Sequence, residues 1–422
     1  MKTPDVGVQE RQGLSRQEWR LIALLFAVAV INYFDRQSLS VVAPRLQAEL
    51  HLSDIGYAHI VSTFLFASAI AYGISGFLSD WLGTRRAMAL FVGWWSLAEA
   101  ATAFATNVWS LAIVRFCLGL GEPGLFVAAP KAVGEVCGKR NRGLAIGLYT
   151  MGATVGAVIA LPVIVAVTTH LPWRSIFLLD GMMGLLWLPL WFAFYRQVRV
   201  DPSTAAQATG TREVLRRSAT WRLMLARGLT DPVWYFFLFW FPKYLHSARG
   251  MPMGAIAKIG WLVYLGAGLG TVLGGLLSRT LIRRGFRVGD AYRWTMLAAA
   301  VIVPLSPLAA IVKSATAAIL IAAVIALAHM AWLVTLTATL VELYPQWQIG
   351  KAAGLVAMGS GFGGMLSSEG VGYLVVHGGY TQVFYLMTLL HPIAIALLWR
   401  ILSEQRPAPL EAIATETQDR YE

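Results

Sequence analysis

The sequence predicts an all-α membrane protein with twelve transmembrane helices arranged as two pseudo-symmetric six-helix bundles. Three observations support this fold class: the composition, the number of long apolar segments and an internal repeat. Hydrophobic residues make up 57% of the 422 positions and charged residues only 13%, whereas soluble proteins carry about 25% charged residues. The mean hydropathy is +0.62. A chain of this composition is expected to reside in a bilayer.

Twelve apolar segments have the length of about 20 residues that a membrane-spanning helix needs. The first six are 19–42, 58–81, 87–106, 108–133, 143–168 and 175–195, and the second six are 221–245, 256–282, 292–312, 315–341, 352–376 and 382–401. The longest polar stretch separates the two sets. We therefore expect an N-terminal bundle (1–196), a cytoplasmic linker (197–219) and a C-terminal bundle with a short cytoplasmic tail (220–422).

The two halves contain matching sequences. Segment 143–156 aligns with segment 350–363 at a constant offset, with identical residues opposite Gly143, Ala145, Gly147, Leu148, Met151, Gly152 and Gly156. A second match joins 76–85 to 275–284. Small residues at such spacings let helices approach closely. Two parallel halves of this kind predict a binding site between them and transport by alternating access.

The net charge of +12 raises the question of nucleic-acid binding. The basic residues do not form one patch but gather in short segments between the apolar runs, near residues 11–20, 85–86, 139–142, 212–222 and 279–287. Cation-poor segments alternate with them, as the positive-inside rule requires. We therefore expect no nucleic-acid partner, and both termini in the cytoplasm. The first 17 residues are polar and show no signal peptide.

Charged residues inside the apolar segments point to function. Asp35 and Arg36 are adjacent in the first segment, and Arg115 and Glu122 lie in the fourth. A charge at the centre of a membrane helix costs roughly 2.5–3.5 kcal/mol on insertion scales, so such residues usually face one another or a wet pathway. The pattern indicates that the protein moves a charged solute across a membrane.

Enzymatic and metal-binding functions find no support in the motifs. The sequence contains no metalloprotease, nucleophile-elbow or phosphate-loop motif. Its two cysteines, Cys117 and Cys137, fall in a membrane segment and in a basic loop, so neither a disulfide nor a metal site is expected.

Several segments resemble a known transporter family. Gly76–Arg86 and Arg115–Glu122 are similar to signatures of the major facilitator superfamily. Within it, segments 32–41, 121–130 and 139–142 resemble the anion:cation symporter family, and segments 230–234 and 328–329 resemble its hexuronate and related sugar-acid transporters. The resemblance covers nearly the whole chain. Ala153 departs from it, because some members have a longer polar side chain there, so no single relative's substrate can be transferred.

The resemblance implies a proton-coupled symporter that imports a small organic anion, a sugar acid such as a hexuronate or hexonate, by alternating access. It implies a monomer in the bacterial cytoplasmic (inner) membrane, with the bilayer, the anion and the proton as partners and with the proton as coupling ion in place of a cofactor. Two alternatives stay open. The substrate could be another carboxylate, aromatic or dicarboxylic, or the protein could be an uncoupled facilitator.

The resemblance and the chemistry together suggest roles for the charged residues. A guanidinium binds a carboxylate through two charge-assisted hydrogen bonds, so Arg36 is the expected substrate ligand. Asp35 and Glu122 match the family's proton-coupling positions, and Arg115 matches a position that supports them. The alternatives are an Arg36 that only neutralises Asp35 or reaches the interface, and a static ion-pair cluster that only fixes packing.

Polar and aromatic side chains in other segments are candidates for binding the body of the substrate. These are Tyr72, Asp231, Trp234, Tyr235, His329, Trp332, Ser360, Ser367, Ser368 and Glu369. Asp231 has a structural alternative, because Arg227 lies one turn away. Asp80, Arg85 and Arg142 are expected to form a cytoplasmic gate, with Asp80 near the start of the eleventh helix, whose N-terminus attracts a carboxylate. Charges that only set topology are the alternative for the arginines.

Overall fold

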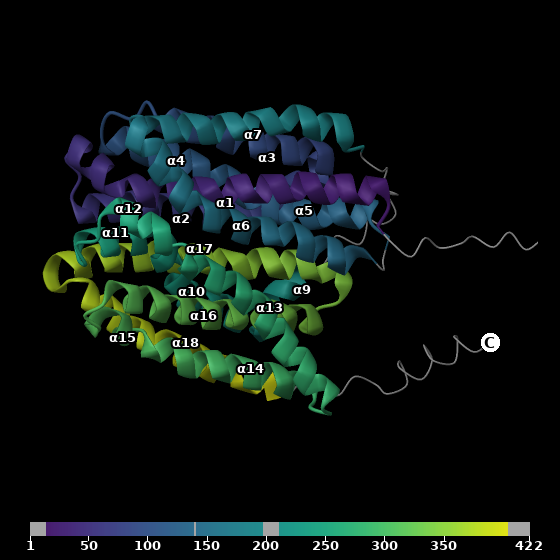
Figure 1. Ribbon diagram of the computed structural model, residues 1–422. Helices are drawn as coiled ribbons and strands as arrows, with labels where there is room; N and C mark the ends of the chain where they lie inside the picture. The colour runs from purple at the N-terminus through teal and green to yellow at the C-terminus, as the bar shows by residue number, and fades with distance from the viewer. Residues whose placement is uncertain (1–13, 139–140, 197–210, 404–422) are drawn as a thin grey trace, which may run out of the picture.

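The chain is described by a computed structural model that covers residues 14–138, 141–196 and 211–403. All regular elements in these ranges are helices, and they run side by side along one common direction (Figure 1). The purple-to-teal helices of the first half lie together on one side, and the green-to-yellow helices of the second half lie on the other. This arrangement agrees with the predicted pair of bundles.

The first half contains six spans. They are α1 (Arg16–Leu50), α2 (Asp54–Leu82), α3 (Thr84–Thr102), α4 with α5 (Val108–Gly121 and Pro123–Val136), α6 (Arg142–His170) and α7 (Arg174–Phe194). The fourth span is broken because Pro123 begins a new helix directly after Glu122. Proline fits the first turn of a helix, where its missing N–H is not needed.

The second half repeats this plan with more breaks. Its spans are α10 with α11 (Ser218–Phe239 and Phe241–Ser247), α12 with α13 (Met253–Ile259 and Leu262–Arg283), α14 with the short η2 and α15 (Val288–Ile302, Val303–Leu305 and Pro307–Ile311), α16 (Ala315–Leu343), α17 (Gln346–Gly378) and α18 (Tyr380–Ser403). Prolines open α11, η2 and α15. The predicted continuous segments missed these breaks because the prolines lie inside long apolar runs.

The count of twelve spans is confirmed. Nine stretches of the described chain are long and apolar enough to cross a membrane. The remaining three, α3, α10 and α17, have 19, 22 and 33 residues, or about 28, 33 and 50 Å at 1.5 Å per residue. They carry more charged, polar or glycine residues because they pack against other helices of the protein.

An even number of spans brings the start of α1 and the end of α18 to one face, which we call the terminal face (Figure 1). The opposite face, which holds the turn between α1 and α2, is called the distal face. Of the predicted linker, residues 197–210 lie outside the described ranges. Thr211–Arg216 form the helix α9, which packs on α10 and α17, and α10 begins at Ser218.

The sequence repeat has a direct structural counterpart. A Cβ atom on Gly152 or Gly156 of α6 would lie 2.4 Å from a backbone oxygen of α1. At the matching positions, a Cβ atom on Gly359 or Gly363 of α17 would lie 2.2 or 1.9 Å from a backbone oxygen of α10. Helix α6 therefore packs on α1 as α17 packs on α10, and only glycine permits either approach.

The two halves meet through α2 against α17 and through α6 against α12 and α13. Several side chains bond across this interface near the distal face. The Tyr57 hydroxyl donates to the Phe239 carbonyl at 2.6 Å, and the Ser62 hydroxyl donates to the Met365 carbonyl at 3.1 Å. Lys243 of α11 forms an ion pair with Asp54 of α2. These contacts close the distal end of the interface.

Candidate functional site

A buried ion pair joins α1 to the break between α4 and α5. Arg36 Nε donates to Glu122 Oε2 at 2.6 Å, and the two side chains are 7% and 0% exposed. Glu122 is the last residue before Pro123, so the interruption of the span brings its carboxylate to α1. The geometry is that of a charge-assisted hydrogen bond in a site shielded from water.

The ion-pair partners of Arg36 and Arg115 are not the charged residues closest to them in the sequence. Arg36 contacts Glu122 rather than its neighbour Asp35, because adjacent residues of a helix do not face each other. Arg115 does not pair with Glu122 along one helix face. Its Nη1 lies 3.4 Å from Glu99 Oε2 of α3. The two guanidinium groups thus form two interhelical pairs, each of which links different helices of the first bundle.

Three carboxyl groups gather beside these pairs. Oxygens of Asp35, Glu99 and Asp180 all lie within 4.8 Å of one another, and each side chain is completely buried. Ser38 of α1 donates a hydrogen bond to Asp180 Oδ2 at 2.5 Å. Neither oxygen of Asp35 has a hydrogen-bond partner in the described part of the chain. Together with Glu122, four buried carboxyl groups thus accompany two buried guanidinium groups.

The Arg36 guanidinium faces the second bundle as well as Glu122. It lies over the rings of Tyr33 and Phe126, each 5.5 Å from the guanidinium carbon. Its electrostatic neighbours include Tyr72 of α2 and Tyr235 of α10. Arg36 therefore lies where the two halves meet, surrounded by aromatic faces and phenol groups.

The second bundle contributes a polar network at the same level. Arg227 Nε donates to Asp231 Oδ2 at 3.0 Å, and the Ser360 hydroxyl of α17 also donates to that oxygen. The Tyr235 hydroxyl lies 2.8 Å from the Ser360 hydroxyl. The electrostatic neighbours of Arg227 also include Tyr72. Two guanidinium groups, one from each half, thus share the same pair of tyrosines.

Two further predicted residues lie deeper in the second bundle. His329 and Trp332 of α16 are completely buried. His329 Nδ1 lies 3.3 Å from Nε2 of His391 in α18, and the Trp332 ring packs edge-on against the same imidazole. Asp231 and Arg227 are electrostatic neighbours of His329. The histidine pair therefore lies next to the polar network of α10, on the side that faces the interior of the second bundle.

The structure distributes the remaining predicted contacts differently. Trp234 packs edge-on against Tyr264, with the ring centres 6.2 Å apart. Ser367 donates to the carbonyl of Gly364 within its own helix. A carboxylate oxygen of Glu369 lies 2.8 Å from His59 Nδ1, and both side chains are well exposed near the distal face. Ser367 also lines a small cavity with Tyr235, whereas Glu369 lies away from the buried charged groups.

The predicted gate residues lie at the terminal face. The side chain of Asp80 lies outside the described part of the structure, so its expected contact with α17 stays a prediction. Arg85 donates to the Phe192 carbonyl of α7 at 2.7 Å. Arg142 donates to the carbonyls of Gly134 and Cys137 at the end of α5. Both recorded arginine contacts lie within the first half.

Four charged or histidine residues of these clusters were not predicted as site residues. Glu99 and Asp180 are carboxylates inside apolar segments, so the criterion that identified Asp35 could have found them. Arg227 was assigned only as a structural partner of Asp231. His391 lies in the last apolar segment and shows its role only through its contact with His329.

Comparison with known proteins places the chain in a family of transporters. The family model described as Major Facilitator Superfamily matches residues 25–325. A hexuronate transporter of Escherichia coli (strain K12) is 26% identical over 423 residues, covering 95% of this chain and 97% of the relative. A galacturonate transporter of Dickeya chrysanthemi is 29% identical over 290 residues, covering 64% of this chain and 84% of the relative.

Solved structures agree with the fold. A bacterial homologue of the human lysosomal transporter Spinster superposes with a TM-score of 0.75 at 19% identity, covering 94% of this chain and 100% of that one. A D-xylose–proton symporter gives a TM-score of 0.71 at 16% identity, covering 92% and 99%. With its family-model match over most of its length and its twelve spans, this chain belongs to the Major Facilitator Superfamily and is a multi-pass membrane transporter rather than an enzyme.

Proposed function

We propose that this transporter is a proton-coupled symporter that imports a sugar acid, a hexuronate or hexonate, across the bacterial inner membrane. The single observation that carries the proposal is the buried Arg36–Glu122 pair at the meeting point of the two halves. The names of the relatives, which include hexuronate, galacturonate and D-galactonate transporters, support the choice of substrate. The terminal face is the cytoplasmic one in this proposal, in line with the positive-inside rule.

The coupling follows from competition for one guanidinium. A substrate carboxylate that binds Arg36 displaces the carboxylate of Glu122. An unpaired carboxylate in a buried site is strongly destabilised, so Glu122 takes up a proton at that moment. Substrate and proton therefore bind together on one side, and both leave when the site opens on the other side.

The neighbouring carboxyl groups supply the route for protons. Four buried carboxyl groups against two guanidinium groups would leave an excess of two negative charges, which a low-dielectric interior does not tolerate. Protons on the group formed by Asp35, Glu99 and Asp180 remove this excess. Arg115, held against Glu99, keeps the group next to the Arg36–Glu122 pair. Asp35 and Glu122 act as the coupling carboxylates in this scheme.

The body of the sugar acid is bound between the halves. Tyr72 from the first half, and Tyr235 and Arg227 from the second, offer hydroxyl and guanidinium groups near Arg36. Phenol and guanidinium groups both form hydrogen bonds with sugar hydroxyls, and the aromatic faces pack against the carbon skeleton. Asp231, which accepts a hydrogen bond from Ser360, holds Arg227 in place.

A dicarboxylic acid is a second candidate substrate, and Arg227 is the observation that favours it. The side chain of Arg227 is partly exposed, and only its Nε has a recorded partner in the described chain. A second carboxylate on the substrate could bind its terminal nitrogens while the first binds Arg36. A relative from Bacillus subtilis is named as a probable galactarate/D-glucarate transporter.

The test is uptake by the purified protein in liposomes with an imposed pH gradient, on a panel of uronates, aldonates, aldarates and aromatic acids. We expect accumulation of a uronate or aldonate that collapses with the pH gradient. Because three clustered carboxylates could also hold a small cation, a parallel series uses a sodium gradient. Accumulation that follows sodium alone, or that needs neither gradient, would reject proton coupling.

Two substitutions test the assignment of the site. Arg36→Ala is expected to abolish substrate binding, measured as a ligand-induced thermal shift. Arg227→Ala is expected to weaken it about tenfold or more, since a charge-assisted hydrogen bond contributes roughly 1.5–3 kcal/mol. Wild-type affinity in the Arg36→Ala protein would refute the role of Arg36. Selective loss of aldarate binding in Arg227→Ala would favour the dicarboxylate candidate.

A further inference from the structure

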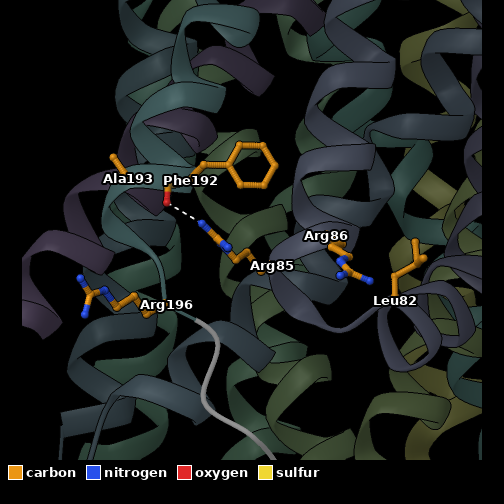
Figure 2. A pocket seen from close by; sticks show the side chains of 6 residues that line it. All are labelled: Leu82, Arg85, Arg86, Phe192, Ala193 and Arg196. Carbon is orange, nitrogen blue, oxygen red and sulfur yellow. Dashed lines mark hydrogen bonds between the residues drawn. The ribbon is translucent and has the colours of Figure 1, made fainter.

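A basic pocket lies apart from the central site, at the terminal face of the first half. It has a volume of about 800 Å³ and lies between the turn from α2 to α3 and the end of α7 (Figure 2). Three arginines and three apolar residues line it, namely Leu82, Arg85, Arg86, Phe192, Ala193 and Arg196. None of these described lining residues is acidic.

One of the arginines is fixed in place. Arg85 Nη2 donates to the Phe192 carbonyl at 2.7 Å, and its guanidinium carbon lies 5.2 Å from the centre of the Phe192 ring. The Trp191 indole donates to the Arg85 carbonyl at 2.9 Å. The close-up shows Arg85 between Phe192 and Arg86, with Arg196 at the end of α7 (Figure 2). The lining is therefore built by contacts between α3 and α7.

The described residues around this pocket balance its positive charge only in part. Among the side chains that the structure describes, which do not include that of Asp80, none forms an ion pair with Arg85, Arg86 or Arg196. One carboxylate, that of Glu135, lies nearby and accepts hydrogen bonds from the hydroxyls of Thr84 and Tyr195, so the three guanidinium groups outnumber it. Three guanidinium groups around one opening create a site for a multivalent anionic group such as a phosphate.

The start of α3 adds to this attraction. Its N-cap is Gly83, and no side chain caps the first turn. Free N–H groups and the positive end of the helix dipole favour an anion at this position. The contribution is secondary to that of the three arginines, but it has the same sign and acts at the same place.

The apolar part of the lining indicates that the ligand is amphiphilic. Phe192 lines the pocket and is 44% exposed, and Phe194 and Leu190 on the same helix are 49% and 50% exposed. Side chains exposed to this extent on a membrane-spanning helix contact lipid chains. A soluble phosphate compound would use only the arginines, whereas a phospholipid would use both parts of the pocket.

We propose that this pocket binds the headgroup of an anionic phospholipid from the leaflet at the terminal face. The lipid phosphate binds Arg85, Arg86 and Arg196, and its acyl chains lie along Phe192 and Phe194. Basic pockets between membrane helices are suited to such headgroups. The lipid ties the α2–α3 turn to the end of α7, which is also where the first half leads toward residue 197.

The test compares lipid binding by the wild-type protein, Arg86→Gln/Arg196→Gln and a matched control, Arg283→Gln/Arg284→Gln. The control removes the same charge from exposed arginines at the terminal end of α13, outside the pocket. Native mass spectrometry with phosphatidylglycerol or cardiolipin measures the retained lipid, and phosphatidylcholine serves as the zwitterionic reference. Each arginine near an anionic lipid contributes roughly fivefold, so the pocket variant is expected to bind about 30-fold more weakly.

A charge-conserving variant and a competition experiment complete the test. Arg86→Lys/Arg196→Lys keeps the charge and is expected to retain most of the affinity, while the control pair is expected to match the wild type. Equal losses in the pocket and control variants would show general attraction to the charged face and overturn the proposal. Displacement of the lipid by millimolar inorganic phosphate, or equal binding of phosphatidylcholine, would also overturn it. Melting temperatures near the wild-type value verify that the variants are folded.

Discussion

At the level of single residues, the contact between Arg36 and Glu122 is the one that a substrate carboxylate has to replace in the proposed function. Their contact is short and shielded, and the rings of Tyr33 and Phe126 flank the guanidinium. Removing one partner of such a buried pair costs roughly 3–5 kcal/mol, because the remaining charge stays unpaired. A substrate carboxylate can take the place of Glu122 without that cost, provided that Glu122 is protonated.

Glu122→Gln is therefore expected to separate accumulation from exchange. The amide keeps the size of the side chain but cannot carry a proton in and out, so accumulation driven by a pH gradient should fall at least tenfold. Exchange of labelled for unlabelled substrate should fall much less, because it needs no net proton movement. Both rates are measured in the same liposomes.

The matched control for this prediction is Glu342→Gln, an exposed carboxylate at the end of α16. It should leave both rates unchanged. An equal loss of accumulation and exchange in Glu122→Gln would mean that the pair is structural and that coupling lies elsewhere, with Asp35, Glu99 and Asp180 as the next residues to test.

At the level of helices, glycines and prolines decide how the spans pack and where they break. Pro123 interrupts the fourth span next to Glu122, and this interruption brings the carboxylate to α1. Glycines on α6 and α17 let the first helix of each half approach backbone to backbone. In a bilayer, close packing of this kind replaces the hydrophobic effect as the main source of helix association.

Gly156→Ala is expected to destabilise the protein, whereas Gly147→Ala on the same helix is not. The new Cβ at position 156 would lie 2.4 Å from the Val30 carbonyl oxygen, while at position 147 it would meet nothing within 4 Å. Overpacking costs typically 1–3 kcal/mol, and an exposed Gly→Ala change in a helix gains about 0.5–1 kcal/mol. Thermal unfolding in detergent measures both.

The test compares the melting temperatures of the two variants. A melting temperature several degrees below wild type for Gly156→Ala, with an unchanged or higher value for Gly147→Ala, would agree with the packing. Equal melting temperatures for the two variants would show that α6 does not approach α1 as closely as the structure has it.

At the level of the whole molecule, the distal face is held closed by contacts between the halves. The ion pair of Lys243 with Asp54 and the hydrogen bond from Tyr57 to the Phe239 carbonyl both cross the interface. The aromatic rings of Tyr57 and Trp240 pack edge-on beside them, 5.1 Å apart. Alternating access requires these contacts to break when the distal side opens.

Asp54→Asn should shift the population toward distal-open states. Lys243 is 4% exposed in the closed arrangement, so loss of its partner destabilises that arrangement by about 1–2 kcal/mol, or roughly 5- to 30-fold in the ratio of states. Spin labels at His170→Cys and Gly254→Cys, at the distal ends of α6 and α12, report the separation of the halves.

The two native cysteines and a control variant have to be considered in this labelling experiment. Cys117 is replaced by serine, and Cys137 is left in place because burial raises the pKa of its thiol to about 11 and makes it unreactive. Asp290→Asn is the control, since its partner Arg293 lies on the same helix. An unchanged distance distribution in Asp54→Asn would show that the ion pair does not control distal closure.

Much of the fold follows from the sequence. Length and hydropathy determine twelve spans, and the spacing of small residues predicts which helices correspond between the halves. Intramembrane charges indicate the region of the candidate site, because burying a carboxylate or guanidinium in a bilayer costs free energy and such residues usually serve a function. Asp35, Arg36, Arg115 and Glu122 were identified on this ground, and the same ground applied consistently would have included Glu99 and Asp180.

Only the tertiary structure decided which carboxylate pairs with which guanidinium group. The chain places Asp35 beside Arg36, yet a helix turns neighbouring side chains in different directions, and the partner of each guanidinium comes from another helix. The same holds for Glu369, which lies with His59 near the distal face, and for the arginine pocket shared by α3 and α7. Local sequence determines where a membrane helix lies along the chain, but its rotation and its partners depend on packing against helices that are distant in sequence.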